Sequence, residues 1–299
     1  MRIIAIFAEL TNQANPLPTM NRILLPIALV LTLVNGCAPG TSKKGKGAPA
    51  AVPAPDTVRM EARPEIPQAA RMVIQAYPDQ RLSYADNKLV FADGTSIVFD
   101  DGVEKDFVTK LDNADVEDMF SLDYDRNDRP AYLADAGRSR CEALFKKMYG
   151  RSAAKVRKNL VDVPWFGQTV KFTRVNGANR QLEKVAREIA GKYPELKKYM
   201  KSSGTFYWRK VRGANRQSAH SYGIAIDINA EYSDYWLWTY PGASETQEIA
   251  YVNRIPLEIV EVFEKHGFIW GGRWYHFDTM HFEYRPEYKT TPGFLRELQ

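Results

Sequence analysis

The sequence of 299 residues contains little cysteine and little histidine. Its two cysteines, Cys37 and Cys141, are too few for a framework of several disulfide bonds, and they do not cluster as the thiolates of a structural zinc site do. All four histidines follow residue 219, so any histidine-dependent chemistry is confined to the C-terminal part of the chain.

The N-terminal part lacks an apolar run long enough for a membrane span, which needs about 20 residues. The run over residues 23–34 is shorter, follows Arg22 and ends in small residues, which is the layout of a signal peptide. Its end, Leu33-Val34-Asn35-Gly36-Cys37, resembles the lipobox of bacterial lipoproteins, in which the cysteine becomes the lipidated first residue. Residues 1–37 are therefore expected to be a signal peptide with Cys37 as the lipidation site. The alternative is a plain secretory signal that is cut near the same place.

Either signal takes the mature protein out of the cytoplasm. The lipoprotein interpretation predicts a cell-envelope protein that faces the periplasm and is held on the membrane by a lipid at Cys37. The residue after the cysteine is Ala38 and not Asp, and this pattern resembles the one for sorting to the outer membrane in a Gram-negative cell. Residues 38–58 are rich in Ala, Pro, Gly, Ser and Lys, a composition that cannot bury a core and predicts a flexible linker. The net charge of +5 suits a cell wall and nucleic acid equally well, so charge alone identifies no partner.

Residues 59–170 carry no chemical signature and are expected to form an N-terminal α/β extension or subdomain. Two β-rich runs flank Asp93-Gly94, which predicts a hairpin. Helices are predicted over Gln68–Tyr77, 115–123 and 138–149. The last of these contains Cys141, which is expected to be a buried, inert thiol.

Residues 171–299 are expected to form the functional domain. The pattern predicts a strand over Val170–Val175 and an amphipathic helix over Gln181–Tyr193. Pro256 opens a further helix, and Gly267 ends it. The expected fold class is α+β: a small antiparallel sheet with packed helices, with the site on the open face of the sheet.

The first motif is Ser218-Ala-His220-Ser-Tyr-Gly223-Ile-Ala225-Ile-Asp227-Ile-Asn229. From Gly223 onward the residues alternate, so three isoleucines point to one face and need a core, while small residues and Asp227 point to the other. Small neighbours leave room beside Asp227 for a bound group. Gly223 lets the backbone bend, so that His220 can reach the same place.

The second motif is Trp270-Gly-Gly-Arg-Trp-Tyr-His276-Phe-Asp278-Thr-Met-His281-Phe-Glu283-Tyr, in which His281 and Glu283 share one face of a predicted strand. If this strand pairs with the Asp227 strand, opposed Cβ atoms come within about 4.5–5.5 Å of each other. Two imidazoles and one carboxylate then surround one point. Three nitrogen or oxygen ligands with an open fourth position are typical of a catalytic zinc site. Asp278 is the natural candidate for the base that deprotonates a bound water.

Ser-x-His-x-x-Gly-x-Ala-x-Asp, followed by Trp-Gly-Gly and Asp-x-x-His-Phe-Glu, resembles the D-alanyl-D-alanine carboxypeptidase family of zinc peptidases. This family includes vancomycin-resistance dipeptidases and carboxypeptidases and phage L-alanyl-D-glutamate endopeptidases, and the resemblance covers about residues 180–288. It implies Zn²⁺ held by His220, Asp227 and His281, with Asp278 as the base. The fold that it implies is similar to that of Hedgehog signalling domains and DD-peptidases.

The family also has an arginine upstream of the first histidine that handles the substrate carboxylate or carbonyl. Arg209 fits this position best, with Arg212 and Arg216 as rivals. Ser218 and Tyr222 are expected to support the site and its substrate through hydrogen bonds.

For each of three further residues, the sequence leaves two interpretations open. Trp274 belongs to a dense group of aromatic residues that forms either the rim of a substrate groove or part of the core. His276 either lines the cleft or is a hydrogen-bonded loop histidine, and Glu283 contacts either the metal shell or only a strand neighbour.

The resemblance implies a zinc metallopeptidase that hydrolyses peptidoglycan stem peptides, either as a D-Ala-D-Ala carboxypeptidase or as an L-Ala-D-Glu endopeptidase. Its expected partners are those stem peptides, with no role for nucleic acid. The alternative is a non-catalytic, zinc-containing module that binds the cell wall. Asp278 at the base position favours the enzyme. The sequence gives no indication of the oligomeric state.

Overall fold

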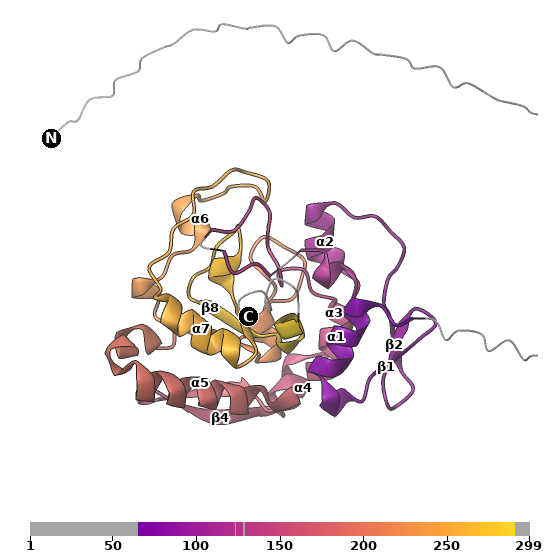
Figure 1. The fold of residues 1–299 in the computed structure, drawn as a ribbon, viewed down its shortest axis with the longest axis horizontal. Helices are drawn as coiled ribbons and strands as arrows, with labels where there is room; N and C mark the ends of the chain where they lie inside the picture. The colour runs from indigo at the N-terminus through magenta and orange to yellow at the C-terminus, as the bar shows by residue number, and fades with distance from the viewer. Residues whose placement is uncertain (1–64, 123, 128, 291–299) are drawn as a thin grey trace, which may run out of the picture. The chain divides into compact units, whose positions relative to one another are not determined.

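A computed structural model describes residues 65–122, 124–127 and 129–290 (Figure 1). The predicted signal peptide, the lipidation site Cys37 and the linker over residues 38–58 lie outside the described residues. No helix within the described ranges is both long enough and apolar enough to cross a membrane. Helices are mixed with small antiparallel sheets, which confirms the α+β class.

The N-terminal elements are a helix and a small three-stranded sheet. Helix α1 (Gln68–Ala76) has nearly the predicted bounds. Strands β1 (Ser83–Ala85), β2 (Lys88–Val90) and β3 (Ser96–Val98) pair antiparallel in the order β1-β2-β3. Gly94 has a φ of +78° between β2 and β3, so the hairpin predicted at Asp93-Gly94 is confirmed.

The helix predicted over residues 115–123 is wrong, because only a 3₁₀ turn over Asp118–Phe120 forms there. Asp115 and Asp118 each accept the other's backbone N–H through a carboxylate oxygen. The ammonium of Lys105 contacts both carboxylates. Local bonds from side chains to the backbone compete with helical hydrogen bonds, and here they prevail.

Two further helices lie on either side of this turn. Helix α2 (Phe107–Asn113) begins after Asp106, whose carboxylate accepts the backbone N–H of Thr109 and so caps the helix. Helix α3 (Glu142–Tyr149) begins later than the predicted residue 138, because the chain turns at Gly137, with a φ of +91°. Cys141 lies directly before α3 and is buried as predicted.

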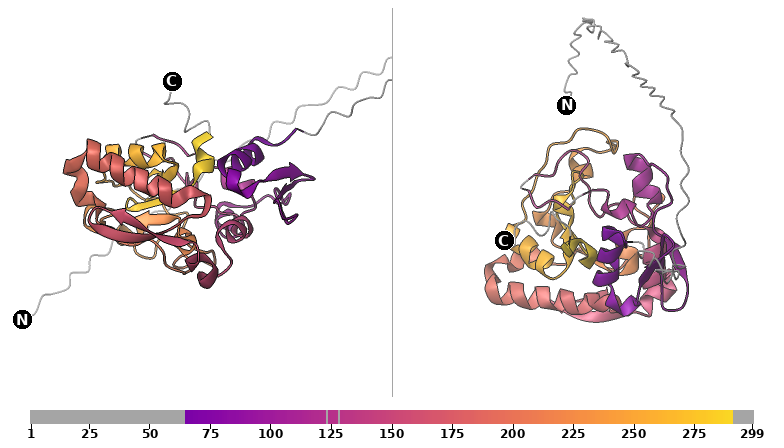
Figure 2. Two further views of the ribbon diagram at one scale, coloured as in Figure 1. Left: turned by 90° about the horizontal axis from the view of Figure 1, so that it is seen from below. Right: turned by 45° about the vertical axis from the view of Figure 1, so that its right-hand side comes forward.

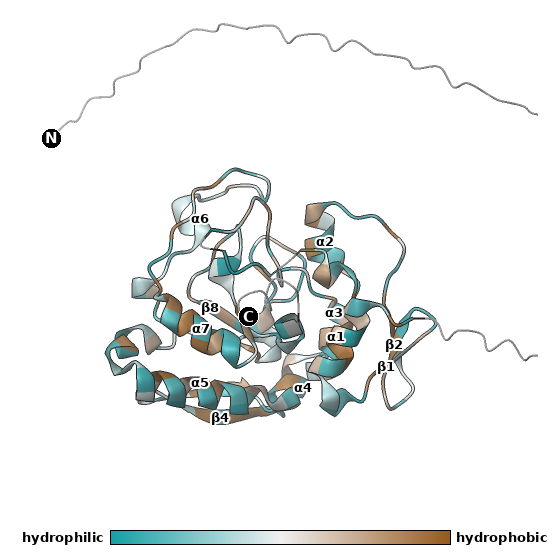
Figure 3. Cartoon of the chain, viewed as in Figure 1, coloured by the Kyte–Doolittle hydropathy of each residue, from teal (hydrophilic) through white to brown (hydrophobic). Residues whose placement is uncertain are grey.

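A hairpin and a long helix form the next layer. Strands β4 (Leu160–Trp165) and β5 (Gln168–Thr173) pair antiparallel, and helix α5 (Ala178–Lys192) packs on them (Figure 2). The predicted strand at 170–175 and the predicted helix at 181–193 correspond to β5 and α5, and each element begins slightly earlier than predicted. Apolar and polar positions alternate along α5 with the period of an amphipathic helix (Figure 3).

The sheet that carries the candidate site is the third one. Strands β6 (Ala225–Asp227), β7 (Phe268–Trp270) and β8 (His281–Tyr284) pair antiparallel with β8 in the centre. Helix α7 (Leu257–Lys265) begins after Pro256 and ends before Gly267, as predicted, and packs against β7 and α5. The remaining helices, α4 (Ala153–Arg157) and α6 (Trp236–Thr239), are short.

One hydrophobic core joins both halves of the described chain. Val73 of α1 and Phe145 of α3 belong to the same cluster of buried side chains as Phe263 of α7 and Phe282 of β8. The division into an extension over 59–170 and a peptidase domain over 171–299 stays a prediction, and its boundary falls within β5.

The ring of Phe282 is fully buried at the centre of this core and stacks on Phe263, with 3.9 Å between ring centroids. Phe282→Ala is expected to lower the free energy of unfolding by about 3–5 kcal/mol, because the lost ring leaves a cavity. Val98→Ala is the control: Val98 is 46% exposed, and its change should stay within about 0.5 kcal/mol. Urea denaturation of the two variants would measure both values, and equal stabilities would contradict this description of the core.

Candidate metal centre

Three side chains converge from two strands and a tight turn. His220 lies on the 3₁₀ helix η5 (Ala219–Tyr222), Asp227 ends β6, and His281 begins β8. Asp227 is directly opposite His281 in the antiparallel pair, as the predicted strand pairing requires. Gly223 has a φ of +68° between η5 and β6, and a Cβ there would lie 2.5 Å from the Leu160 side chain. The predicted bend at Gly223 is therefore present.

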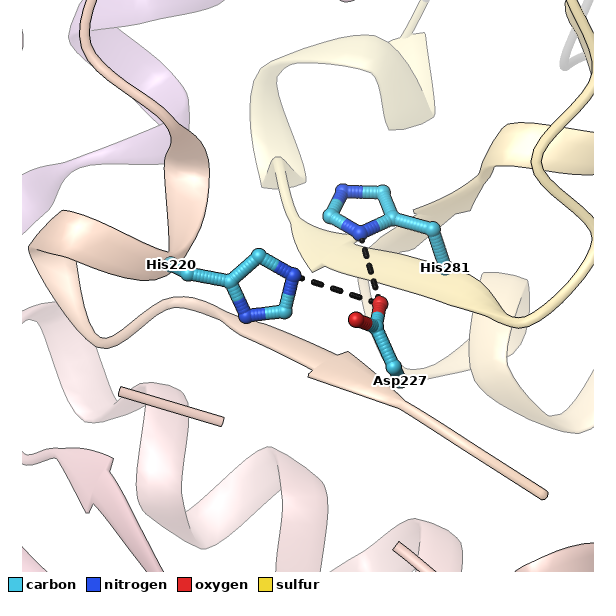
Figure 4. Close-up of side chains that lie close together, drawn as sticks. All are labelled: His220, Asp227 and His281. Carbon is cyan, nitrogen blue, oxygen red and sulfur yellow. Dashed lines mark hydrogen bonds and ion pairs between the residues drawn. The ribbon is translucent and has the colours of Figure 1, made fainter. Parts of the chain in front are cut away.

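The two imidazoles point at the carboxylate of Asp227 (Figure 4). Asp227 Oδ1 lies 3.2 Å from His220 Nε2 and 3.0 Å from His281 Nδ1. Ligands about 2.0–2.1 Å from a tetrahedral zinc ion are about 3.3 Å from one another, so these separations fit a metal shell. Two imidazole nitrogens and one carboxylate oxygen are also the donor set that such an ion accepts. The three residues can therefore hold a metal ion.

The other ring nitrogen of each imidazole, which faces away from Asp227, lies near a hydrogen-bond acceptor. His220 Nδ1 lies 2.5 Å from the carbonyl oxygen of Thr205, and His281 Nε2 lies 3.5 Å from Glu283 Oε2. When a metal binds, an N–H donated to each of these acceptors leaves the facing nitrogen unprotonated, as the metal requires. Without a metal, burial would lower the pKa of His281, but Asp227 and Glu283 raise it to about 10, so its ring is then charged. Glu283 therefore contacts Nε2 of His281, the ring nitrogen that faces away from Asp227.

Glu283 itself is fully buried between two arginines. Arg140 Nη1 lies 3.4 Å from Oε2, and Arg285 Nη1 lies 3.1 Å from Oε1. Burial alone would raise the pKa of Glu283, but the charge of Arg140, the hydrogen bond with His281 and the charge of Arg285 lower it to about 2. Glu283 is therefore a carboxylate at neutral pH. Arg140 comes from the segment before α3, and no sequence signal connected it with the site.

The pKa values of the carboxyl groups of Asp227 and Asp278 are shifted in opposite directions. Burial would raise the pKa of Asp227, but the charges of His220 and His281 and their hydrogen bonds hold it well below its ordinary value. Burial and then the negative charge of Asp227 raise the pKa of Asp278 to about 7. Asp278 Oδ1 is buried and has no hydrogen-bond partner within the described part of the chain. A carboxyl group with a pKa near neutrality and a free oxygen can exchange protons with a bound water.

The Trp-Gly-Gly motif allows the Asp278 segment to lie close to the sheet. The backbone N–H of Asp278 donates to the carbonyl of Gly271, with a distance of 3.0 Å between nitrogen and oxygen. A Cβ on Gly271 would lie 2.5 Å from the Asp278 carbonyl oxygen, and one on Gly272 would lie 2.2 Å from the Trp270 ring. Neither position has room for any side chain.

A cavity of about 500 Å³ opens above the centre, and its wall includes the three ligands and Asp278. Arg209 and Arg212 also line it, are exposed, and have no carboxylate partner in the described ranges. Arg216 lines the cavity too, but it is buried and its guanidinium lies 2.7 Å from Asp112. Arg209 and Arg212 are therefore free to contact a ligand, whereas Arg216 already has a partner.

The other predicted substrate contacts are divided between cavity and core. Ser218 and Trp274 line the cavity, and the Trp274 ring lies 5.5 Å from the His281 ring. Tyr222 is not part of the cavity wall, because its ring is buried against Phe145 and Tyr149. The structure thus places Ser218 and Trp274 at the site and Tyr222 in the core behind it.

Sequence reasoning missed a group of charged residues around His276. Asp135 and Arg138 lie before α3, and Glu245 lies in the loop after α6. They meet at the imidazole of His276 on the cavity wall. No local pattern could reveal this group, because Asp135 and Arg138 lie more than a hundred residues before Glu245 and His276.

Replacement of a ligand should abolish metal retention. His281→Ala is expected to weaken metal binding by more than the about 10–100-fold that follows loss of an outer-shell partner. His266→Ala is the matched control, because His266 lies at the end of α7 and binds Glu188 at 2.9 Å. Metal content per chain after dialysis, measured by plasma mass spectrometry, would test this. An equal content in both variants would contradict the assignment.

Glu283→Gln should weaken metal binding about 10–100-fold, because it removes the charge behind His281. Glu287→Gln is the control: Glu287 is equally buried, accepts from Arg285 Nε at 2.5 Å and from the hydroxyl of Tyr77 at 2.5 Å, and belongs to the same buried network. Both variants should lose stability, and only Glu283→Gln should lose metal affinity in a competition titration. If both variants kept the affinity of the wild type, Glu283 would have no role at the centre.

Comparison with known families gives an independent result. Residues 212–284 match the family model described as D-alanyl-D-alanine carboxypeptidase. The matched stretch contains the three candidate ligands and Asp278, and it excludes Arg209 and the Asp135–Arg140 segment. No curated protein and no solved structure matches the chain. The match supports assignment of this part of the chain to the peptidase family, and with it a hydrolase activity.

Proposed function

We propose that the protein is a zinc metallopeptidase that hydrolyses the stem peptides of peptidoglycan. One observation carries the proposal: His220, Asp227 and His281 converge in one cavity with Asp278, whose Oδ1 atom has no hydrogen-bond partner among the described residues. The peptidase family match over the same residues supports it. The metal is proposed to be zinc because the donor set combines two imidazoles with one carboxylate and has no thiolate.

When bound, zinc would polarise a carbonyl group and lower the pKa of a water molecule to about 7. Asp278 accepts a proton from the attacking water and delivers it to the leaving amine. Burial and the charge of Asp227 raise the pKa of Asp278 to about 7, so it can take up and release a proton near neutral pH. Arg209 or Arg212 at the mouth of the cavity binds the substrate carboxylate or its carbonyl oxygen.

Ser218 and the aromatic side chains of the cavity wall position the substrate. Tyr235, Trp236, Trp238 and Trp274 line the cavity, and Trp238 is 54% exposed. Aromatic rings offer flat apolar walls with polar edges, which suit the short side chains and the amide groups of a stem peptide. The fold around this wall is proposed to be of the Hedgehog and DD-peptidase type.

The proposed substrate agrees with the proposed location. A lipid at Cys37 and a linker over residues 38–58 would hold the catalytic part near the membrane in the cell envelope. In a Gram-negative cell this membrane would be the outer one, and the site would face the periplasm, where peptidoglycan lies.

Asp278→Asn should leave metal content nearly unchanged and lower kcat by about 10²–10⁴-fold, because the general base is lost. Asp162→Asn, at an exposed carboxylate of β4 that pairs with Lys171, should keep full activity. The assay is the release of products from intact muropeptides, read by mass spectrometry with and without a chelator. Chelation should stop the reaction, and added zinc should restore it.

The products identify the bond that is cut. Loss of one D-alanine indicates a carboxypeptidase, and a cut between L-Ala and D-Glu indicates an endopeptidase. An active Asp278→Asn variant would show that the base is misassigned. No cleavage by the zinc-loaded wild type would instead support the second candidate, a non-catalytic module that binds the cell wall.

A further inference from the structure

Tyr235 lies directly opposite Asp278 in an antiparallel bridge between the segment that follows β6 and the segment that precedes β8. The backbone hydrogen bonds on either side of this pair, at 2.9 Å each, join the neighbouring residues and do not join the two residues themselves. Tyr235 and Asp278 are therefore a non-hydrogen-bonded pair. In such a pair the two side chains point to the same face and lie closer together than in a hydrogen-bonded pair.

Both side chains of this pair line the cavity of the candidate metal centre. Asp278 Oδ1 has no hydrogen-bond partner in the described part of the chain. The hydroxyl of Tyr235 forms no hydrogen bond to the described residues either, since burial and charges alone shift its pKa. Two neighbouring polar groups thus face the cavity without binding each other, and a molecule in the cavity can contact both.

The ring of Tyr235 packs edge-on against two tryptophans of α6. Its centroid lies 6.5 Å from that of Trp236, with 78° between the ring planes, and 5.9 Å from that of Trp238, with 87° between the planes. The position of the phenol is therefore fixed before any ligand binds. A donor that is already in place needs no reorganisation at the moment of reaction.

The hydroxyl of Tyr235 is a hydrogen-bond donor at neutral pH. Burial and then the negative charge of Asp278 raise the pKa of Tyr235 to about 12, against the opposing charge of Arg138. The phenol therefore keeps its proton and can donate it in one hydrogen bond. Its half-buried position makes such a bond stronger than the same bond in open water.

Hydrolysis of a peptide bond needs a donor close to the base. The water that Asp278 deprotonates attacks the carbonyl carbon, so this carbon and its oxygen must lie near the Asp278 carboxyl group. The carbonyl oxygen becomes negatively charged as the tetrahedral intermediate forms. Only a donor that binds this oxyanion more strongly than it binds the planar carbonyl accelerates the reaction. The phenol opposite Asp278 faces the same part of the cavity.

We propose that Tyr235 is a catalytic residue whose hydroxyl donates a hydrogen bond to the oxyanion of the tetrahedral intermediate. The inference rests on the proposed peptidase function and deepens it, because it assigns a residue to the reacting oxygen. The oxygen of the water adds to the carbonyl carbon, its proton passes to Asp278, and an electron pair of the C=O bond moves to the oxygen. The C–N bond then breaks, and Asp278 delivers the proton to the leaving nitrogen. Tyr235 keeps its own proton throughout.

The first test is Tyr235→Phe, which removes only the hydroxyl. It is expected to lower kcat by about 10²–10³-fold, the loss typical of one oxyanion donor, with little change in KM. Tyr232→Phe is the matched control: Tyr232 is also half-buried, packs on Tyr199 with 5.0 Å between ring centroids, and is not part of the cavity wall. It should keep the activity of the wild type. Metal content should be equal in all three proteins.

The second test measures binding and not turnover. A phosphinate in place of the scissile amide carries a tetrahedral, anionic centre, and such analogues are made for the D-Ala-D-Ala bond and for the L-Ala-D-Glu bond. Calorimetry with the zinc-loaded proteins should show that Tyr235→Phe weakens binding of the analogue of the cleaved bond about 10²–10³-fold. The uncleaved stem peptide should bind equally to the Asp278→Asn variant with and without Tyr235→Phe.

The outcomes separate this inference from the proposed function. Cleavage by the wild type with an unchanged kcat in Tyr235→Phe would overturn the inference and leave the peptidase intact. A wild type that cleaves neither bond but binds one phosphinate better than Tyr235→Phe does would support the donor and refute the proposed hydrolysis. Equal binding of both phosphinates by the two proteins would overturn the inference whatever the activity. A loss that appears mainly in KM and in binding of the uncleaved peptide would also overturn it, because Tyr235 would then bind substrate and oxyanion alike.

Discussion

The antiparallel pairing of β6 with β8 is the interaction on which the candidate centre depends. It puts Asp227 opposite His281 and fixes the distance between the two side chains before any metal binds. A slip of one residue would turn His281 into the core and Phe282 into the cavity, because successive side chains point to opposite faces. The buried stack of Phe282 on Phe263 makes that slip costly. The packing of Phe282 on one face of β8 thus fixes the position of His281 on the other face.

The segment before α3 supports this pairing from outside the matched stretch. Arg140 binds Glu283, which contacts the back of His281, and Arg138 with Asp135 fixes His276. Buried charges of this kind are tolerated because each has a partner, and removal of one partner leaves the other uncompensated in a medium of low polarity. The N-terminal half is therefore part of the structure that orients the site, and it shares its core with the C-terminal half.

Opposite electrostatic requirements meet within one cavity. A metal ligand must stay ionised, and the two imidazoles keep the pKa of Asp227 low despite burial. A proton shuttle must titrate near neutral pH, and burial beside Asp227 raises the pKa of Asp278 to about 7. The same carboxylate at position 227 thus contacts both imidazoles and raises the pKa of Asp278. Separation of two carboxyl groups into a permanent anion and a proton carrier is a general arrangement of acid–base sites.

The sequence by itself determined the α+β class, the hairpin at Asp93-Gly94 and the bend at Gly223, and it predicted the candidate set His220, Asp227, His281 and Asp278. These follow from alternation, turn chemistry and spacing, which act over a few residues. Tertiary structure alone decided that Glu283 contacts the back of His281, that Tyr222 lies in the core, and that Asp135, Arg138 and Glu245 meet at His276. It also replaced the helix predicted over 115–123 by a turn, because Asp115, Asp118 and Lys105 bind one another. Such contacts join residues far apart in the chain, and the common core that brings them together has no local signature.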